Sequence, residues 1–291
     1  MTAQTRAAFF ALLAAALYAL NSPVSKLLLA SVSPMMMASL LYLGAGGGML
    51  LLALGKRKRT EKRKTILNQR DLPYTLGMIV LDVFAPIFLM LGLARTTAEN
   101  ASLLNNFEIV ATSLIAMLIF KERISKRLWG AIALIVLSSV MLTVTDASSL
   151  EFSFGSVLVL LAASCWGMEN NCTRMLSQSD PQEIVVVKGF GSGVGSLIVA
   201  LLAGESAPGI GSAAAALLLG FVAYGLSIYF YVLAQRDLGA ARTSAYYAVA
   251  PFIGVLLSLM IFREMPGTMF FAALAVMIAA TVLVTKDQEQ A

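Results

Sequence analysis

Long apolar runs, separated by short polar or charged segments, recur along the whole chain. A helix that crosses the hydrocarbon core of a bilayer needs about 20 mostly apolar residues. The runs therefore predict ten membrane-spanning helices and leave little chain for a domain outside the membrane. The expected spans are residues 7–28, 34–54, 73–93, 98–120, 128–146, 155–176, 182–204, 213–235, 241–262 and 267–285.

The second half of the chain repeats the pattern of the first. Phe120-Lys121-Glu122 matches Phe262-Arg263-Glu264 at an offset of 142 residues, and Ser33-Pro34 matches Asp180-Pro181 at an offset of 147. Each half holds five predicted spans, an odd number, so the halves must cross the membrane in opposite orientations. We therefore predict an all-α integral membrane protein made of two inverted five-helix repeats, an architecture of many secondary transporters. The repeats are expected at residues 1–147 and 148–291.

Composition and charge agree with a membrane protein. Hydrophobic residues make up 59% of the chain and charged residues 13%, and the mean hydropathy is +0.83; soluble domains carry about 25% charged residues. Basic residues gather after the second predicted span, at 56–64, and after the fourth, whereas the loop after the seventh, 204–211, has none. Because Lys and Arg accumulate in cytoplasmic loops, we expect both termini in the cytoplasm and the protein in the cytoplasmic (plasma) membrane of a prokaryote.

The basic residues also give a pI near 9.3, which can indicate nucleic-acid binding. The cluster at 56–64 lies between two predicted spans, where it is expected to set the topology and to contact anionic membrane lipid. We therefore expect no nucleic-acid partner.

The chain lacks the usual signs of a metal site, a cofactor or ATP hydrolysis. It has no histidine, and Cys165 and Cys172 are seven residues apart on one predicted helix, about 10 Å along its axis, too far for a disulfide. No GxxxxGK[ST] phosphate-binding motif occurs, so transport would draw on a gradient or on exchange. We expect neither a metal nor a cofactor.

The region from Thr96 to Leu142 resembles the EamA family of the drug/metabolite transporter superfamily. The family pattern is an Ala- and Ser-rich helix, then Phe-(Lys/Leu)-Glu-Arg, then Trp-Gly at the start of the next span. Residues of the first half that fit it are Phe120, Glu122, Arg123, Trp129 and Gly130. The second half fits through Ala240, Ser244, Pro251, Phe262 and Glu264. The resemblance implies a ten-helix exporter with a central cavity lined by both repeats, and a substrate among amino acids, other metabolites and drugs.

Two positions depart from the family pattern. Family members carry Pro and, seven residues later, Arg at the start of the second span of each half; here Pro181 is followed by Lys188, and Pro34 by Leu41. Many relatives also have a proline in the middle of the fourth span, where this chain has Glu108. The coupling step of this protein is therefore not taken over from the family.

Three acidic residues within predicted spans are candidates for proton coupling: Glu108, Glu169 and Asp82. A charge at the bilayer centre costs about 2.5–3.5 kcal/mol on insertion scales, so such residues mark ion or substrate pathways. A carboxyl group in an apolar environment can also exchange a proton near physiological pH.

Glu108 is the leading candidate because it belongs to a polar stripe. Ser102, Asn105, Glu108 and Thr112 recur at helical spacing and are expected on the face that lines a cavity. The alternative for Glu108 is a structural role as partner of a buried amide or hydroxyl group.

Further polar and aromatic residues at mid-span are candidates for substrate binding. Glu169-Asn170-Asn171 matches the region of Asn21 in the inverted repeat, so both first helices bring polar groups to the same depth; an interhelical hydrogen-bond cluster is the alternative. Lys188 is expected to hold a substrate carboxylate, pair with a buried acid or extend to the interface. Tyr246 and Tyr247, with Tyr224, Tyr229 and Tyr231, are expected to line a cavity that binds planar or cationic solutes, although the adjacent Tyr246 and Tyr247 cannot share one helix face. The candidates are Tyr18, Asn21, Asn105, Asn106, Trp166, Asn170, Lys188, Tyr246 and Tyr247.

Glycine runs at 44–48 and 189–195 contain GxxxG spacings and lie in predicted spans, which favours close helix packing.

These features predict a secondary active transporter, a proton-coupled exporter or exchanger of amino acids or related amines and drugs, acting as a monomer or weak dimer. The alternatives are an uncoupled facilitator and a lipid-modifying membrane enzyme. The enzyme would need a nucleophile, base or metal cluster, and the usual arrangements are missing from a chain without histidine, so we expect no enzyme activity.

Overall fold

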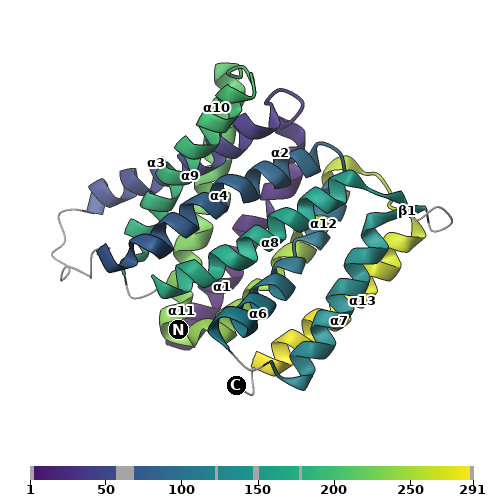
Figure 1. Ribbon diagram of the computed structural model, residues 1–291. Coiled ribbons are helices and arrows are strands. Elements are labelled where there is room, and N and C mark those ends of the chain that lie inside the picture. Colours follow the sequence, from purple (N-terminus) through teal and green to yellow (C-terminus); the bar gives the residue numbers. More distant parts are fainter. Residues whose placement is uncertain (1–2, 57–68, 122–123, 147–150, 177–178, 289–291) are drawn as a thin grey trace.

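The computed structural model describes residues 3–56, 69–121, 124–146, 151–176 and 179–288, and these are mostly helical (Figure 1). The first half holds α1 (Ala3–Ala19), α2 (Asn21–Leu28), α3 (Pro34–Lys56), the 3-10 turn η1 (Gln69–Asp71), α4 (Leu72–Leu93), α5 (Ala98–Leu104), α6 (Phe107–Phe120) and α7 (Lys126–Thr143). Two short antiparallel strands, β1 (Val144–Asp146) and β2 (Glu151–Phe152), link the halves. The second half holds α8 (Phe154–Met175), α9 (Pro181–Leu202), α10 (Ile210–Gly220), the π-helix η2 (Phe221–Leu226), α11 (Ser227–Tyr247), α12 (Ala250–Phe262) and α13 (Thr268–Gln288).

The predicted all-α membrane fold of ten spans is confirmed. Eight helical segments of the described chain are each long and apolar enough to cross a membrane, and α12 is a shorter apolar helix. The sixth span, α8, also has 22 residues, with Glu169 and Arg174 in its more polar second half. Five spans in each half give the two repeats opposite orientations.

Three predicted spans are interrupted rather than continuous. The first is divided between α1 and α2 at Leu20, three residues before Pro23, whose missing N–H leaves a backbone carbonyl of the preceding turn unpaired. The fourth is divided at Asn105-Asn106, where short amide side chains compete with the helical hydrogen bonds. The ninth is divided just before Ala250-Pro251, because a proline disfavours helical geometry in the residues that precede it.

The predicted boundary between the eighth and ninth spans was wrong. A loop was expected at 236–240, but α11 continues through these residues to Tyr247. The segment lacks proline, and its single glycine, Gly239, is tolerated within a helix at a cost of about 1 kcal/mol.

The breaks and caps repeat between the halves. The interruption at Asn105-Asn106 and the one at Ala248-Val249 are separated by nearly the same offset as the sequence repeat. Lys121 and Arg263 end α6 and α12 in the left-handed conformation, both with φ of 56°. A positive φ is uncommon outside glycine, so the same turn at both sites is local structural evidence for the repeat.

The halves pack by pairing helices across the repeat. Helix α3 packs against α9, α4 against α8, α1 against α11, and α7 against α13. At the α3–α9 contact a Cβ atom on Gly46 would stand 2.9 Å from the backbone nitrogen of Phe190. Glycine is required at this crossing, and the predicted close packing of the two glycine runs is confirmed.

Candidate functional site

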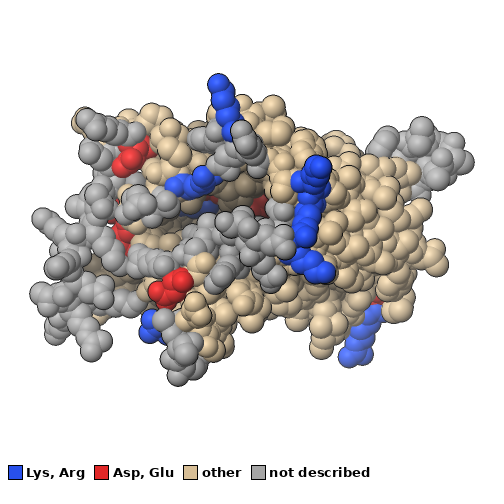
Figure 2. Space-filling view, turned by 90° about the horizontal axis from the view of Figure 1, so that it is seen from below, with Lys and Arg blue, Asp and Glu red and all other residues tan. Residues whose placement is uncertain are grey.

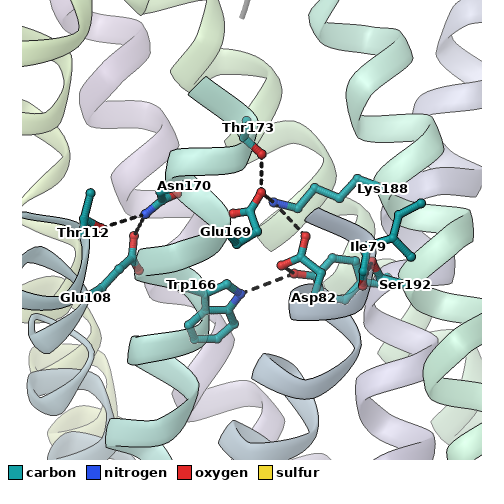
Figure 3. A network of polar contacts seen from close by, with 11 residues as sticks. Ile79, Asp82, Glu108, Thr112, Trp166, Glu169, Asn170, Thr173, Lys188 and Ser192 are labelled. Atoms are coloured by element: carbon teal, nitrogen blue, oxygen red, sulfur yellow. Dashed lines mark hydrogen bonds and ion pairs between the residues drawn. The ribbon is translucent and has the colours of Figure 1, made fainter. Parts of the chain in front are cut away.

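An ion-paired cluster lies where α4, α8 and α9 meet near the middle of the spans (Figure 3). The Lys188 ammonium is 3.0 Å from a carboxylate oxygen of Asp82 and 3.0 Å from one of Glu169. All three residues are buried, with Asp82 at 0% exposure. A buried charge is tolerated when it is paired and hydrogen-bonded. Of the three alternatives for Lys188, the structure contains the pairing with buried acids.

Hydroxyl groups complete the hydrogen bonding of the two acids. The Tyr42 hydroxyl, from α3, donates to Asp82 at 2.8 Å, and the Thr173 hydroxyl donates to Glu169. The Trp166 indole N–H donates to the Tyr42 hydroxyl at 3.5 Å. The cluster therefore joins α3 and α4 of the first repeat to α8 and α9 of the second.

Glu108 lies on α6 beside this cluster and is held differently. The Asn170 amide donates to the Glu108 carboxylate and also reaches the Thr112 hydroxyl at 3.5 Å. The Asn171 amide donates to the Thr112 carbonyl at 3.2 Å, which fastens α6 to α8. Glu108 is half-buried and accepts its hydrogen bond from a neutral amide, so its negative charge is not balanced by a contact ion pair as those of Asp82 and Glu169 are.

The predicted polar stripe does not lie on one continuous helix face, because the break at Asn105-Asn106 divides it between α5 and α6. Glu108 and Thr112, on α6, both meet Asn170. Ser102 and Asn105, on the α5 side of the break, have buried oxygen atoms without a hydrogen-bond partner in the described part of the chain.

A neutral, aromatic cluster lies beside the charged one. The Asn21 amide donates to the Tyr224 hydroxyl at 3.0 Å, and the Asn21 oxygen accepts a hydrogen bond from Ser25 at 3.1 Å. The Tyr224 ring lies 5.1 Å from the Tyr42 ring and 6.0 Å from the Tyr18 ring, centroid to centroid. Tyr42 therefore connects the two clusters, since its ring packs on Tyr224 while its hydroxyl binds Asp82.

The structure brings most of the predicted site residues together, with two exceptions. The Tyr247 ring lies 5.8 Å from the Tyr18 ring, centroid to centroid, whereas Tyr246 is 40% exposed on the outer surface, as expected for adjacent residues. The Asn106 amide turns back to the Leu103 carbonyl of its own helix at 3.5 Å.

Sequence reasoning did not select Tyr42 and Thr173 as site residues, whereas Tyr224 was among the tyrosines expected to line a cavity. A tyrosine in the middle of an apolar span needs a hydrogen-bond partner for its hydroxyl, and this signal could have identified Tyr42. Thr173 follows Glu169 by one helical turn, which places the two side chains on the same face.

The face of the molecule that carries both termini is hollowed at its centre. Figure 2 shows acidic and basic side chains in and around this recess. Polar groups at the base of an opening between spans are typical of a solute pathway.

The three carboxyl groups and one ammonium group carry an excess of negative charge when all are ionised. In a medium of low dielectric constant that excess is costly, and a proton or a cationic solute reduces it. Among the described residues, no group of three or more His, Cys, Asp or Glu side chains is placed to hold a metal ion. The arrangement is suited to alternate binding of protons and a small molecule.

Comparison with known proteins places these features in context. The model of the EamA-like transporter family matches residues 5–144 and 153–286. An uncharacterized transporter of Methanothermobacter thermautotrophicus is 26% identical over 268 residues, which cover 85% of this chain and 76% of that protein. The uncharacterized inner membrane transporter YedA of Escherichia coli is 22% identical over 261 residues, covering 87% of this chain and 81% of its own. A solved crystal structure matches with a TM-score of 0.70 at 16% identity, over 99% of this chain and 100% of that one, and so has the same fold.

Proposed function

Since the chain belongs to the EamA-like transporter family, we propose that it is a proton-coupled exporter or exchanger of small organic metabolites, such as amino acids or related amines and drugs. It is a multi-pass membrane transporter of a small-molecule substrate. The two termini are placed in the cytoplasm, because the basic loops follow the even-numbered spans.

One observation carries the proposal: Lys188 is shared by Asp82 and Glu169, while Glu108 stands beside them with a neutral partner. Lys188 balances one of the two acids next to it, and Glu108 adds a further negative charge. A proton or a substrate ammonium group would neutralise that charge. Because both compete for the same negative charge, binding of one favours release of the other, which is the thermodynamic requirement for exchange.

Glu108 is assigned the coupling role ahead of Glu169 and Asp82. It is half-buried and has no contact ion pair with Lys188, whereas the other two carboxylates are buried and engaged with Lys188. It is also fixed to α8 through Asn170, so a change in its charge acts directly on the contact between α6 and α8.

The aromatic cluster supports a substrate that carries an ammonium group on an apolar or aromatic body. The Tyr18 ring packs with those of Tyr224 and Tyr247, and Tyr224 packs against Tyr42, whose hydroxyl binds Asp82. Cations are attracted to such faces by about 0.5–2 kcal/mol, depending on desolvation. Asn21 and Asn170 add amide groups for orientation, and Trp166 adds a further apolar surface.

A single chain supplies every residue of this site, with contributions from both repeats. No second copy is needed to complete it, and we therefore propose that the monomer is the transporting unit.

The test has two stages. Purified protein is first screened for thermal stabilisation by amino acids, nucleobases, amines and drugs, since a ligand that binds the folded state raises its melting temperature. Flux of radiolabelled benzyltrimethylammonium, a permanent cation with one aromatic ring, is then measured in proteoliposomes with and without an imposed proton gradient.

We expect the gradient to drive accumulation of the label and a proton ionophore to abolish it. Flux that is equal with and without the gradient would identify an uncoupled facilitator. Absence of both stabilisation and flux for all cations would contradict the assigned substrate class.

A further inference from the structure

A cavity lies at the end of the molecule opposite the termini, away from the ion-paired cluster. Its volume is about 500 Å³. Its lining comes from the ends of the first, third, fifth and ninth spans and the starts of the fourth and sixth, so it faces the non-cytoplasmic side in the proposed topology. The charged residues that line it are Lys26, Arg95, Glu99 and Glu264.

Glu99, in the first turn of α5, is an unpaired acid in this cavity. Its residue is 4% exposed, yet no hydrogen bond or ion pair reaches its carboxyl group from the residues that the structure describes. The Lys26 ammonium lines the same cavity but donates to the carbonyls of Leu93 at 2.6 Å and Thr96 at 2.7 Å. The Glu99 carboxyl group therefore opens onto the cavity, where it can exchange a proton with the cavity's contents.

The other charged groups around Glu99 are also engaged elsewhere or lie at the surface. The Arg95 guanidinium donates to the Leu91 carbonyl at 2.9 Å and lies over the Phe154 ring. Glu264, just after α12, is exposed to solvent. Glu99 therefore faces Lys26 from α2, Arg95 from the segment before α5, and Glu264 from the end of α12, without a contact ion pair to any of them.

Unpartnered polar atoms continue from Glu99 toward the central site. Ser102 and Asn105 follow at successive intervals of three residues, so each lies about one turn beyond the residue before it. The Ser102 hydroxyl and the Asn105 side-chain oxygen are buried and lack a hydrogen-bond partner among the described residues. Glu108 comes three residues later, at the start of α6.

A close contact with α12 leaves room for the Ser102 hydroxyl. A Cβ atom on Gly254 would stand 2.9 Å from that oxygen, so a larger residue there would press on it. Gly254 is the repeat equivalent of Thr112, at the offset of 142 residues. Glycine at this position keeps a polar atom in the contact between the two repeats.

We propose that Glu99 is the outer proton-exchange group and that it passes protons between the non-cytoplasmic cavity and Glu108 by way of Ser102 and Asn105. The proposal rests on the proton coupling proposed above and extends it to a route. Glu99 and Glu108 are nine positions apart, roughly 13 Å along a helix axis, which is too far for direct transfer.

In each transfer one proton leaves the Glu99 carboxyl group and one proton reaches the Glu108 carboxylate. A protonated Glu99 gives its proton to the chain of hydrogen bonds and becomes a carboxylate, while the Glu108 carboxylate receives a proton at the other end. The Ser102 hydroxyl accepts one proton as it releases its own, with water carrying the proton across the remaining gaps. The Asn105 oxygen accepts a hydrogen bond and orients the neighbouring donor without being protonated. At its inner end Glu108 faces Asn170, with Glu169 and Lys188 beyond it on α8 and α9.

The experiment measures efflux from right-side-out membrane vesicles loaded with radiolabelled benzyltrimethylammonium, as the external medium is made more acidic. We expect Glu99→Gln to slow proton-driven efflux by about a hundredfold, the lower end of the range of general acid–base contributions. Exchange of internal for external benzyltrimethylammonium at equal pH should stay within about twofold of the wild type, because it needs no net proton transfer.

Two further variants separate a relay from a structural effect. Glu264→Gln removes the same charge from the same cavity and measures the effect of charge alone. Glu99→Ala leaves space for a small weak acid, so external formate should restore part of its efflux rate while leaving the wild-type rate unchanged. Rescue by a proton carrier is not expected for a residue that acts through packing.

The outcomes are distinct. Wild-type efflux that ignores the proton gradient would overturn the proposed function and the relay with it. Gradient-driven wild-type efflux that Glu99→Gln leaves unchanged, or that Glu264→Gln slows equally, would overturn the relay alone. Failure of formate to accelerate Glu99→Ala would also count against proton transfer at this position.

Discussion

The two repeats place equivalent helices around the centre of the molecule and furnish them with different chemistry. Asp82 on the third span has Tyr224 as its equivalent on the eighth, and Lys188 on the seventh has Leu41 on the second, at the offsets of 142 and 147 residues. Glu169 on the sixth span corresponds in the same way to the region of Asn21 on the first. One junction of the repeats is therefore charged, through Asp82, Glu169 and Lys188, and the other is neutral, through Asn21 and Tyr224.

The two repeats share their backbone features and differ in their ionisable side chains. The helix pairs, the interrupted fourth and ninth spans and the left-handed caps at Lys121 and Arg263 recur in both halves. These features depend on backbone geometry and close packing. The ionisable groups occur at one junction, so a change in protonation would act on one side of a nearly symmetric frame and bias it toward one of two arrangements.

The largest difference between the junctions should appear when the shared cation is removed. Lys188→Met leaves two buried carboxyl groups without a counter-charge, and breaking such a pair costs about 3–5 kcal/mol. Thermal unfolding of the purified variant should show this loss. The loss should shrink in acid, because protonated carboxyl groups need no cation.

The matched control is Leu41→Met at the equivalent position of the other repeat, where a swap of similar volume costs less than about 1.5 kcal/mol. Equal destabilisation by Lys188→Met and Leu41→Met would mean that the ion pairs add nothing to the packing of this junction.

Close packing between the repeats should come second. At Gly189 a Cβ atom would lie 2.9 Å from the carbonyl oxygen of Tyr42 and closer still to the backbone of Gly46. Gly189→Ala is therefore expected to lower the unfolding free energy by about 1–3 kcal/mol through overpacking.

Gly47 has open space around its Cβ direction, so Gly47→Ala should be neutral or slightly stabilising in the same denaturation experiment. Comparable losses for Gly189→Ala and Gly47→Ala would argue that α3 and α9 do not cross at the glycines.

A smaller effect should distinguish the two central tyrosines. Tyr42→Phe removes a hydrogen bond to the Asp82 carboxylate, worth about 1.5–3 kcal/mol, and Tyr224→Phe removes one to the neutral Asn21 amide, worth about 0.5–1.5 kcal/mol. Tyr42→Phe should also shift the pH dependence of benzyltrimethylammonium transport, whereas Tyr224→Phe should not. A pH profile altered equally by both would show that the neutral junction takes part in coupling.

Much of the fold could be predicted because the spans are long and apolar and the halves repeat. The predicted helix boundaries were wrong where the local signals for a helix and for a loop are of similar strength. At 236–240, charged residues and one glycine indicated a loop, yet helix α11 continues. At Asn105-Asn106, apolar residues on both sides indicated one helix, yet the two amides interrupt it. Such boundaries depend on tertiary contacts that a single sequence does not contain.

The residue types of the candidate site could be predicted from the sequence, but the contacts between these residues could not. Acids and a lysine within apolar spans are conspicuous, so Asp82, Glu169 and Lys188 were selected. Their mutual contact depends on how α4, α8 and α9 pack, and the offset of the repeat does not report it. Glu99 was left out because it begins a span, where an acid near a helix N-terminus is ordinary; its burial and missing partner are visible only in three dimensions.

The most direct test of the charged junction as the coupling site is gradient-driven transport by Glu108→Gln in proteoliposomes. Glutamine keeps the size and hydrogen bonding of the side chain and removes its titration. The variant is expected to fold, to bind benzyltrimethylammonium with one affinity at every pH, and to exchange it across the membrane. Acceleration of the flux by an imposed proton gradient should be lost, while Glu183→Gln, a matched change near the start of α9, should retain it. Full gradient-driven transport by Glu108→Gln would contradict the assignment and reduce Glu108 to a packing residue, leaving Glu169 as the next carboxylate to be replaced.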